Sequence, residues 1–301
     1  MSVRPIKKLV TSQPTIEGAG VHLRRAFGFG DTSDTDPFLL LDDFRNDRPD
    51  EYLAGFPWHP HRGIETITYV LAGTVEHGDS LGNTGSLGAG DVQWMTAGSG
   101  IIHQEMPHGD PEGRMHGFQL WANLPSSLKM TAPRYQDVKS ADIPEVVDDD
   151  QTKVRIICGT FWGATGPVDG VAAEPQYLDV WVPPRTKKRL PVETTRHAFA
   201  YVFAGSGTFG NASEPRPVTT EKVGSAETAS TDPIENRSLV IFDRGDEVVI
   251  DSGEKGIRFL LVSGKPIKQP IAWHGPMVMN TEAEIRQAFA EYQDGSFLKH
   301  R

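Results

Sequence analysis

Cysteine is almost absent from this chain of 301 residues, which contains a single one, Cys158. One cysteine excludes an intramolecular disulfide. Cys158 lies in the apolar run Val154–Phe161, and the sequence places no base next to it. We therefore interpret Cys158 as a buried, inert thiol, in preference to a nucleophile.

Long hydrophobic runs are also missing. No stretch approaches the roughly 18 consecutive apolar residues that a membrane-spanning helix needs. The first residues, Met1–Lys8, contain no apolar core of a secretory signal peptide. We expect a soluble protein of the cytoplasm, or of the nucleus if the source is eukaryotic.

Positive charge is in short supply, since the formal net charge is −10 and the pI is about 5.5. Direct nucleic-acid binding needs a basic face that neutralises phosphates, so the composition argues against it. A protein partner is not excluded. The one dense basic cluster, Lys187–Arg189, is expected to be a solvated loop.

The hydrophobic, glycine and proline content of the chain predicts a β-rich globular protein. Hydrophobic residues make up 38% of the chain, which is enough for packed cores, and 31 Gly and 22 Pro favour many turns. Short apolar or alternating runs recur between these turns and predict strands in a sandwich or barrel. The predicted strands are Glu65–Leu71, Val92–Met95, Phe118–Ala122, Val154–Ile157, Leu178–Val182, Phe199–Phe203, Leu239–Phe242 and Phe259–Val262.

The chain repeats itself, because the sequence Tyr-Val-Leu-Ala-Gly at 69–73 returns as Tyr-Val-Phe-Ala-Gly at 201–205. Two copies of one unit predict two similar β-domains. We expect an N-terminal barrel at 1–136 and a C-terminal barrel at 137–301, with a proline-containing connection at 124–150. The second copy is longer by an insertion at about 211–236, whose polar composition predicts a surface loop.

A helix is predicted near the C-terminus. Thr281 and Glu284 form a capping-box pattern. Apolar residues then follow at helical spacing: Ile285, Ala288, Phe289 and Tyr292. We expect this helix to pack on a barrel without a catalytic part.

The strongest chemical signal is a pair of short motifs, His59-Pro-His61 and His103-Gln-Glu105. In a strand, residues i and i+2 point to the same face, so two such strands inside a barrel would bring three imidazoles and a carboxylate together. This donor set suits Fe(II), Mn, Co, Ni, Cu or Zn, and does not suit Ca or Mg. Four ligands would leave up to two positions of an octahedral ion open for chemistry.

An isolated His-x-His motif is weak, since histidines in strands are often hydrogen-bonded core or surface residues. The repeat helps to decide. The second copy carries other residues at the equivalent positions: Pro191, Glu193, Arg258 and Leu260. We therefore predict one transition-metal ion per chain, held by His59, His61, His103 and Glu105. Glu65 is either a further ligand or, as we favour, a partner that orients an imidazole.

The sequence resembles the pirin family of the cupin superfamily. The matching stretches are Gly55–Glu65, Gly90–Met106, Gln119–Leu124 and Trp273–Met277. The resemblance implies an all-β fold of two face-to-face cupin barrels with a short C-terminal helix. It also implies iron in the N-terminal barrel, with His59, His61, His103 and Glu105 matching the family's three histidines and one glutamate. The insertion at 211–236 departs from the compact family pattern.

The resemblance further implies a quercetin 2,3-dioxygenase activity, in which a flavonol bound through Fe(II) reacts with O₂. Glu105 would then be both ligand and general base. Three aromatic residues are candidates for the pocket wall, with core packing as the other interpretation: Phe56, Trp58 and Trp94. The alternative function is a non-enzymatic iron or redox sensor that binds protein partners as a transcriptional co-regulator. A metal-dependent isomerase or hydrolase is a weaker third hypothesis. We expect a monomer.

Overall fold

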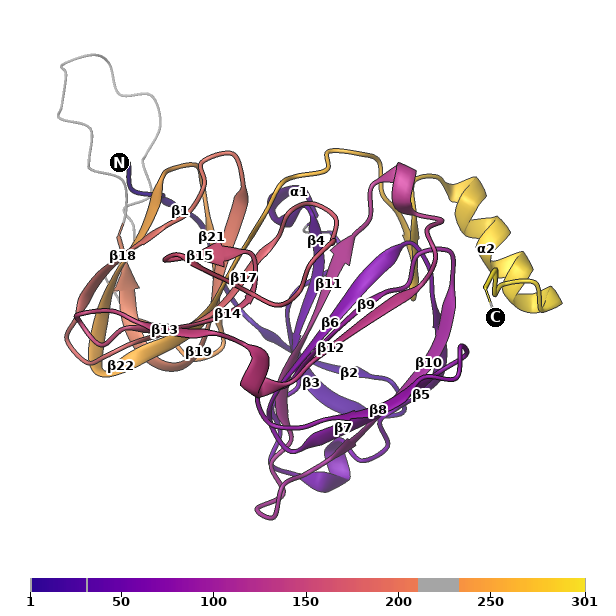
Figure 1. The fold of residues 1–301 in the computed structure, drawn as a ribbon, viewed down its shortest axis with the longest axis horizontal. Helices are drawn as coiled ribbons and strands as arrows, with labels where there is room; N and C mark the ends of the chain where they lie inside the picture. The colour runs from indigo at the N-terminus through magenta and orange to yellow at the C-terminus, as the bar shows by residue number, and fades with distance from the viewer. Residues whose placement is uncertain (1, 31, 211–232, 301) are drawn as a thin grey trace.

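The computed structural model describes residues 2–30, 32–210 and 233–300. Two β-barrels lie face to face, and a helix lies at the outer end of the first barrel (Figure 1). The predicted all-β architecture with a short C-terminal helix is confirmed. Most of the predicted insertion, residues 211–232, lies outside the described residues.

The first barrel consists of two antiparallel sheets. Its strands are β2 (Gln13–Glu17), β3 (Val21–Phe27), β4 (Phe38–Asp43), β5 (Phe56–His61), β6 (Ile64–Ala72), β7 (Thr74–Asp79), β8 (Thr84–Leu87), β9 (Val92–Thr96), β10 (Ile101–His108), β11 (His116–Asn123) and β12 (Arg134–Val138). The larger sheet has the order β12-β9-β6-β11-β4-β3-β2, and the smaller has the order β5-β10-β7-β8. Single-turn helices connect the strands: α1 (Thr32–Thr35), η1 (Pro49–Glu51), η2 (Ser126–Leu128) and η3 (Ser140–Asp142).

The second barrel is one large sheet that curves around its own core. Its strands are β1 (Ile6–Thr11), β13 (Glu145–Val147), β14 (Lys153–Cys158), β17 (Gln176–Val182), β18 (Lys187–Pro191), β19 (His197–Phe209), β20 (Ile234–Glu235), β21 (Ser238–Phe242) and β22 (Glu247–Gly264). The long strands β19 and β22 contain register shifts, which let a sheet bend. Apolar side chains fill the interior, among them Val154, Leu178, Val202 and Phe259.

Alternate side chains along β6 face opposite sides of the sheet, as the sequence pattern predicts. Ile67 and Tyr69 face the core shared by the two barrels, whereas Thr68 points into the first barrel.

All eight predicted strands lie within observed ones. The prediction of a solvated loop at Lys187–Arg189 is wrong, because these residues form strand β18 against β22. There Lys188 pairs with the carboxylates of Asp148 and Asp150.

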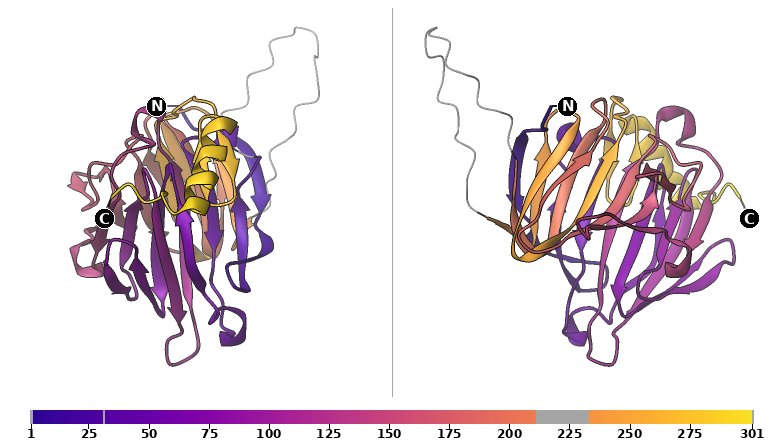
Figure 2. Two further views of the ribbon diagram at one scale, coloured as in Figure 1. Left: turned by 90° about the vertical axis from the view of Figure 1, so that its right-hand side faces the viewer. Right: turned by 60° about the vertical axis from the view of Figure 1, so that its left-hand side comes forward.

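Each end of the chain crosses to the other barrel. Strand β1 pairs with β21 of the second barrel. The hairpin β23 (Ala272–His274) and β24 (Met277–Met279) and helix α2 (Glu282–Asp294) lie on the first barrel, as Figures 1 and 2 show. The predicted capping box is present, since Thr281 accepts from the amide of Glu284 and the Glu284 side chain accepts from that of Thr281. A boundary at residue 136 stays a prediction. A further hairpin, β15 (Thr160–Phe161) and β16 (Ala164–Thr165), lies in the second half.

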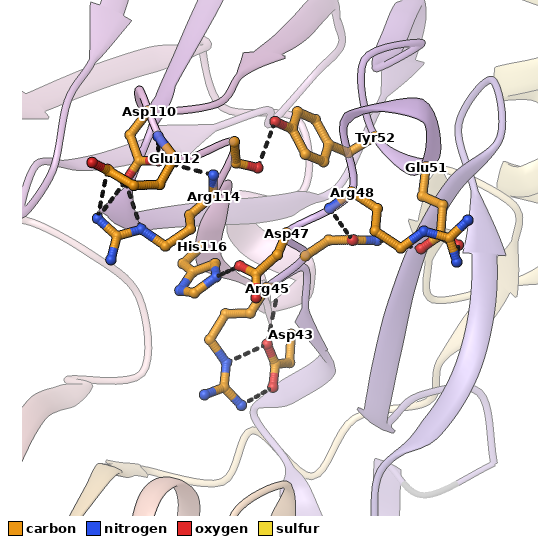
Figure 3. A network of polar contacts seen from close by, with 12 residues as sticks. Asp43, Arg45, Asp47, Arg48, Glu51, Tyr52, Asp110, Glu112, Arg114 and His116 are labelled. Carbon is orange, nitrogen blue, oxygen red and sulfur yellow. Dashed lines mark hydrogen bonds and ion pairs between the residues drawn. The ribbon is translucent and has the colours of Figure 1, made fainter.

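Polar contacts support the end of the first barrel and its interface with the second. Asp43 and Arg45 form an ion pair in Figure 3, and the Arg45 guanidinium also lies over the ring of Phe203 from the second barrel. In the same view, the Tyr52 hydroxyl donates to the carbonyl oxygen of Gly113 at 2.9 Å, which ties together two connections at the barrel end. Neither α2, with its 13 residues, nor any other helix in the described ranges could serve as a membrane span.

Candidate metal centre

The three predicted histidines gather at one point. Strands β5 and β10 are antiparallel neighbours, and His103 lies opposite His59. One ring nitrogen from each of His59, His61 and His103 falls within 4.8 Å of the others. No second group of this kind occurs in the part of the chain that the structure describes. The three histidines thus lie together as their spacing indicated, and their binding of a metal ion stays a prediction.

The hydrogen bonds of His59 and His61 fix where their protons are. His59 Nδ1 lies 2.9 Å from the carbonyl oxygen of Pro57, and His61 Nδ1 lies 3.0 Å from that of Pro276. A carbonyl oxygen only accepts, so each Nδ1 must carry the hydrogen. In the neutral rings each Nε2 then presents a lone pair, and these two nitrogens are 3.1 Å apart.

Two lone pairs at this separation repel each other unless a cation lies between them. Protonation of His61 or of His103 does not supply one easily. Burial and the neighbouring charge of His59 lower the pKa of His61 to about 3, and burial lowers that of His103 well below its ordinary value. Two nitrogens bound at about 2.1 Å and at right angles on one metal ion would be about 3.0 Å apart. The arrangement thus fits a shared metal ion.

His103 points to the same conclusion. Its side chain is 1% exposed, and neither ring nitrogen has a hydrogen-bond partner among the described residues. A buried imidazole without a partner is costly, and coordination of a cation would remove that cost. The three imidazoles therefore form a donor set that fits a borderline divalent ion.

Glu105 lies close to this group but is not part of it. The extra residue of the register shift between β5 and β10 lies on β5, and β10 pairs with β7 without interruption, so His103 and Glu105 share one buried face of β10. The Glu105 carboxylate accepts a hydrogen bond of 3.0 Å from the hydroxyl of Thr68. Burial raises the pKa of Glu105. Its predicted role as fourth ligand stays a prediction.

Glu65 does not orient an imidazole, so that prediction is wrong. Its carboxylate accepts from Thr96 at 2.7 Å, and the imidazoles of His59 and His61 use backbone carbonyls. The reason is a turn at Gly63, which has φ of +78° and separates β5 from β6. A Cβ atom there would clash with the carbonyl oxygen of Val278, so the turn requires glycine. Strand alternation does not carry across such a turn.

A cavity of about 650 Å³ opens beside the histidines, inside the first barrel. His59, His61 and Glu105 contribute to its wall. Most of the remaining wall is apolar and includes Leu23, Leu40, Phe44, Val75 and Met115. A few polar side chains interrupt it, namely Glu17, Arg25, Asp42, Thr68 and Gln119. This mixture is typical of sites for small, largely apolar ligands.

The aromatic wall differs in part from the prediction. Phe56 lines the cavity, but Trp58 is 53% exposed and Trp94 is buried in the core between the barrels. Two tryptophans that the sequence interpretation missed, Trp121 and Trp273, line the cavity instead. The ring of Trp121 lies 5.0 Å from that of His61 and 5.9 Å from that of Trp273.

Neither the single cysteine nor the described part of the second barrel contributes a comparable site. Cys158 is 2% exposed, and burial raises the pKa of its thiol to about 12, so the prediction of a buried thiol is confirmed. Leu260, the counterpart of Glu105, lies in the core between the barrels. Arg258, the counterpart of His103, is paired with Asp179.

Comparison with known proteins covers nearly the whole chain. The family model described as Pirin matches residues 20–122, and the model of the Pirin C-terminal cupin domain matches residues 177–298. A pirin-like protein of Caulobacter vibrioides is 44% identical over 298 residues, which are 99% of this chain and 100% of that protein. Human pirin is 37% identical over 295 residues, covering 97% of this chain and 93% of its own.

A solved structure shows the same fold. The crystal structure of a quercetin 2,3-dioxygenase from Acinetobacter baumannii superposes with a TM-score of 0.84 at 30% identity, covering 98% of this chain and 99% of that one. Because the two family models match both barrels and close relatives extend over almost the full length, the chain belongs to the pirin family, and its two barrels are cupin domains.

Proposed function

We propose that this protein is a metal-dependent dioxygenase of the quercetin 2,3-dioxygenase type, which acts on flavonols. The observation that carries the proposal is the pair of Nε2 lone pairs of His59 and His61, which face each other at 3.1 Å beside a cavity of about 650 Å³. The similarity to the quercetin 2,3-dioxygenase of Acinetobacter baumannii, at 30% identity over almost the full length, supports the reaction class.

His59, His61 and His103 would hold the ion, with Glu105 as the fourth ligand, and Fe(II) is the metal that we propose. Mn, Co, Ni, Cu and Zn suit the same donors, so the choice depends on supply as well as on affinity. When bound, the metal would supply the redox centre at which a deprotonated flavonol and O₂ react.

The cavity wall explains how the chain would select a flat aromatic substrate. The rings of Trp121 and Trp273 line the cavity next to His61, the proposed metal ligand, and much of the remaining wall carries aliphatic side chains. Stacking and apolar burial would hold the flavonol rings and exclude water from the reacting atoms. Gln119 and Thr68 offer hydrogen bonds to the substrate hydroxyl groups.

Glu105 would take a proton from the substrate. The Thr68 hydroxyl lies 3.0 Å from Glu105 Oε1 and 2.6 Å from the Gln119 side-chain amide. Since a hydroxyl has one hydrogen to donate, it donates to Glu105 when this carboxylate is ionised and to Gln119 Oε1 when Glu105 is protonated. In the first case Gln119 turns its NH₂ group toward Thr68. The three residues thus accommodate both protonation states, as a general base requires.

The test is oxygen uptake by iron-reconstituted protein with and without quercetin. We expect uptake that depends on quercetin and that is lost in His61→Ala and in Glu105→Gln. His108→Ala serves as the matched control, because His108 lies on the same strand β10 but is exposed and outside the cavity. One bound iron per chain without quercetin-dependent uptake would overturn the proposal. That result would favour the alternative, a metal-dependent protein that binds partners.

A further inference from the structure

The C-terminal segment is tied directly to the strand that carries two of the histidines. The carbonyl oxygen of Pro276 accepts from His61 Nδ1 at 3.0 Å, and the Val278 amide donates to the carbonyl oxygen of Arg62 at 3.1 Å. The ammonium group of Lys129 donates to the carbonyl oxygens of both Gly63 and Val278, each at 2.8 Å. Residues 61–63 and 276–278 are thus connected by two direct hydrogen bonds and by the ammonium group of Lys129, which bonds to both, although more than two hundred residues of sequence separate them.

Arg62, the residue after His61, is fixed by the same segment. Its side chain is 2% exposed. Nη1 pairs with Glu291 at 2.7 Å, Nη2 donates to the carbonyl oxygen of Phe297 at 2.8 Å, and the guanidinium lies 4.3 Å from the centre of the Phe297 ring. Only Nε uses the first barrel itself, through the carbonyl oxygen of Ser99 at 2.7 Å. A buried charge of this kind is stable only while its partners are in place.

The hairpin also builds part of the cavity. Trp273, Gly275 and Pro276 line it, so the segment contributes a wall as well as a hydrogen-bond acceptor. Behind the hairpin, Met277 packs in one apolar cluster with Ile285 of α2 and with Phe297. Figure 2 shows α2 in front of the strands of the first barrel. The apolar cluster and the Arg62 contacts together hold the hairpin at the cavity.

We infer that residues 272–299 are a positioning element of the metal centre, in which the Pro276 carbonyl orients His61 and the Arg62–Glu291 pair holds that carbonyl in place. The inference rests on the metal centre proposed above. Without Pro276, the hydrogen of His61 would be free to move to Nε2, which would remove the lone pair that the metal needs. Loss of such an outer contact to a ligating histidine typically costs 10–100-fold in metal affinity.

The coupling must also work in the opposite direction. If docking of α2 strengthens metal binding, then a bound metal stabilises the docking of α2 by the same factor. Helix α2 contributes no residue to the cavity wall, so a purely structural helix would not respond to the ion. This reciprocity separates a positioning role from simple packing.

The experiment measures Co(II) affinity by competition with a chelator, together with the visible spectrum of the bound ion. Glu291→Ala removes the carboxylate partner of Arg62 without touching the cavity, and we expect it to weaken Co(II) binding roughly tenfold. Glu291→Gln, which keeps an oxygen acceptor, should recover most of the affinity. Glu282→Ala is the matched control, because Glu282 is an exposed glutamate of the same helix and should leave the affinity unchanged.

Hydrogen exchange of the wild-type protein provides a second readout that needs no variant. We expect Co(II) to slow amide exchange in residues 282–294, and this decides the matter even if Glu291→Ala does not fold. Co(II) that binds the wild type without slowing this exchange would overturn the inference, and so would an unchanged Co(II) affinity in a folded Glu291→Ala variant. A wild-type protein that binds no Co(II) would instead overturn the metal centre itself.

Discussion

The phenol of Tyr69 in the first barrel donates a hydrogen bond of 2.7 Å to the carboxylate of Asp179 in the second. Its counterpart in the repeat, Tyr201, donates one of 2.8 Å to Asp43 of the first barrel. The tyrosine of each repeat therefore donates a hydrogen bond across the interface to a carboxylate of the other barrel. Each carboxylate is in addition paired with an arginine of its own barrel.

Tyr69→Phe should lower the free energy of unfolding by roughly 1.5–3 kcal/mol, because it removes a buried hydrogen bond to a charged group. Urea denaturation followed by fluorescence measures the change. Tyr292→Phe is the control, since Tyr292 is 40% exposed, and its effect should stay within about 0.5 kcal/mol. Equal stability of Tyr69→Phe and the wild type would mean that this contact does not hold the barrels together.

A bound metal ion should raise the free energy of unfolding, and this gain should depend on His59. At a metal concentration one hundred times Kd, binding adds about 2.7 kcal/mol to the free energy of unfolding. Without metal, His59→Ala relieves the repulsion between the facing Nε2 atoms of His59 and His61, so it should cost little stability. Thermal unfolding with and without Co(II) measures both effects. An equal rise in Tm for His59→Ala and the wild type would contradict this prediction.

The contribution of Glu291 should depend on pH. Burial opposes its ionisation, but hydrogen bonds from Lys299, Gln287 and Arg62 outweigh burial and hold its pKa at about 2. A carboxyl group with a folded pKa below its ordinary value of 4.5 stabilises the fold above pH 4.5 and loses this contribution as the pH falls toward 2. The difference in unfolding free energy between the wild type and Glu291→Gln should therefore shrink over this range. A difference that does not change with pH would rule out the charge as its source.

Cys158 should not react with thiol reagents in the folded protein. Its side chain is 2% exposed, and burial raises the pKa of its thiol to about 12, so almost no thiolate exists near pH 8. A chromogenic disulfide reagent should label it at pH 8 only after denaturation in guanidinium chloride. Rapid labelling of the native protein would show that the thiol is accessible.

Local rules in the sequence predicted the parts of the structure that are local. Alternation along a strand placed His59 and His61 on one face, and the capping box at Thr281 and Glu284 marked the start of α2. The same alternation indicates that Trp58 faces away from its histidine neighbours, and it is indeed exposed. Alternation alone does not settle the pocket wall, because Phe56 has the same parity as Trp58 and still lines the cavity beyond the register shift in β5.

Long-range contacts were beyond these rules. Trp273 and Pro276 reach the cavity from the far end of the chain, because the C-terminal hairpin returns to the first barrel. No pattern of side chains near residue 273 predicts that this hairpin packs on the first barrel. The prediction for Glu65 failed for a related reason, since the turn at Gly63 separates β6 from β5 and the Glu65 carboxylate accepts its hydrogen bond from Thr96. The partners that orient the imidazoles are backbone carbonyls, which carry no sequence signal.

The most direct test of the central claim is the metal content of the purified protein and of two single variants, measured by elemental analysis after incubation with Fe(II) and removal of unbound ion. We predict about one equivalent per chain in the wild type and in His108→Ala, whose histidine is exposed on β10. His103→Ala should retain little or none, because it removes one of the three gathered imidazoles. Equal metal content in His103→Ala and the wild type would contradict the assignment of the metal centre to this site.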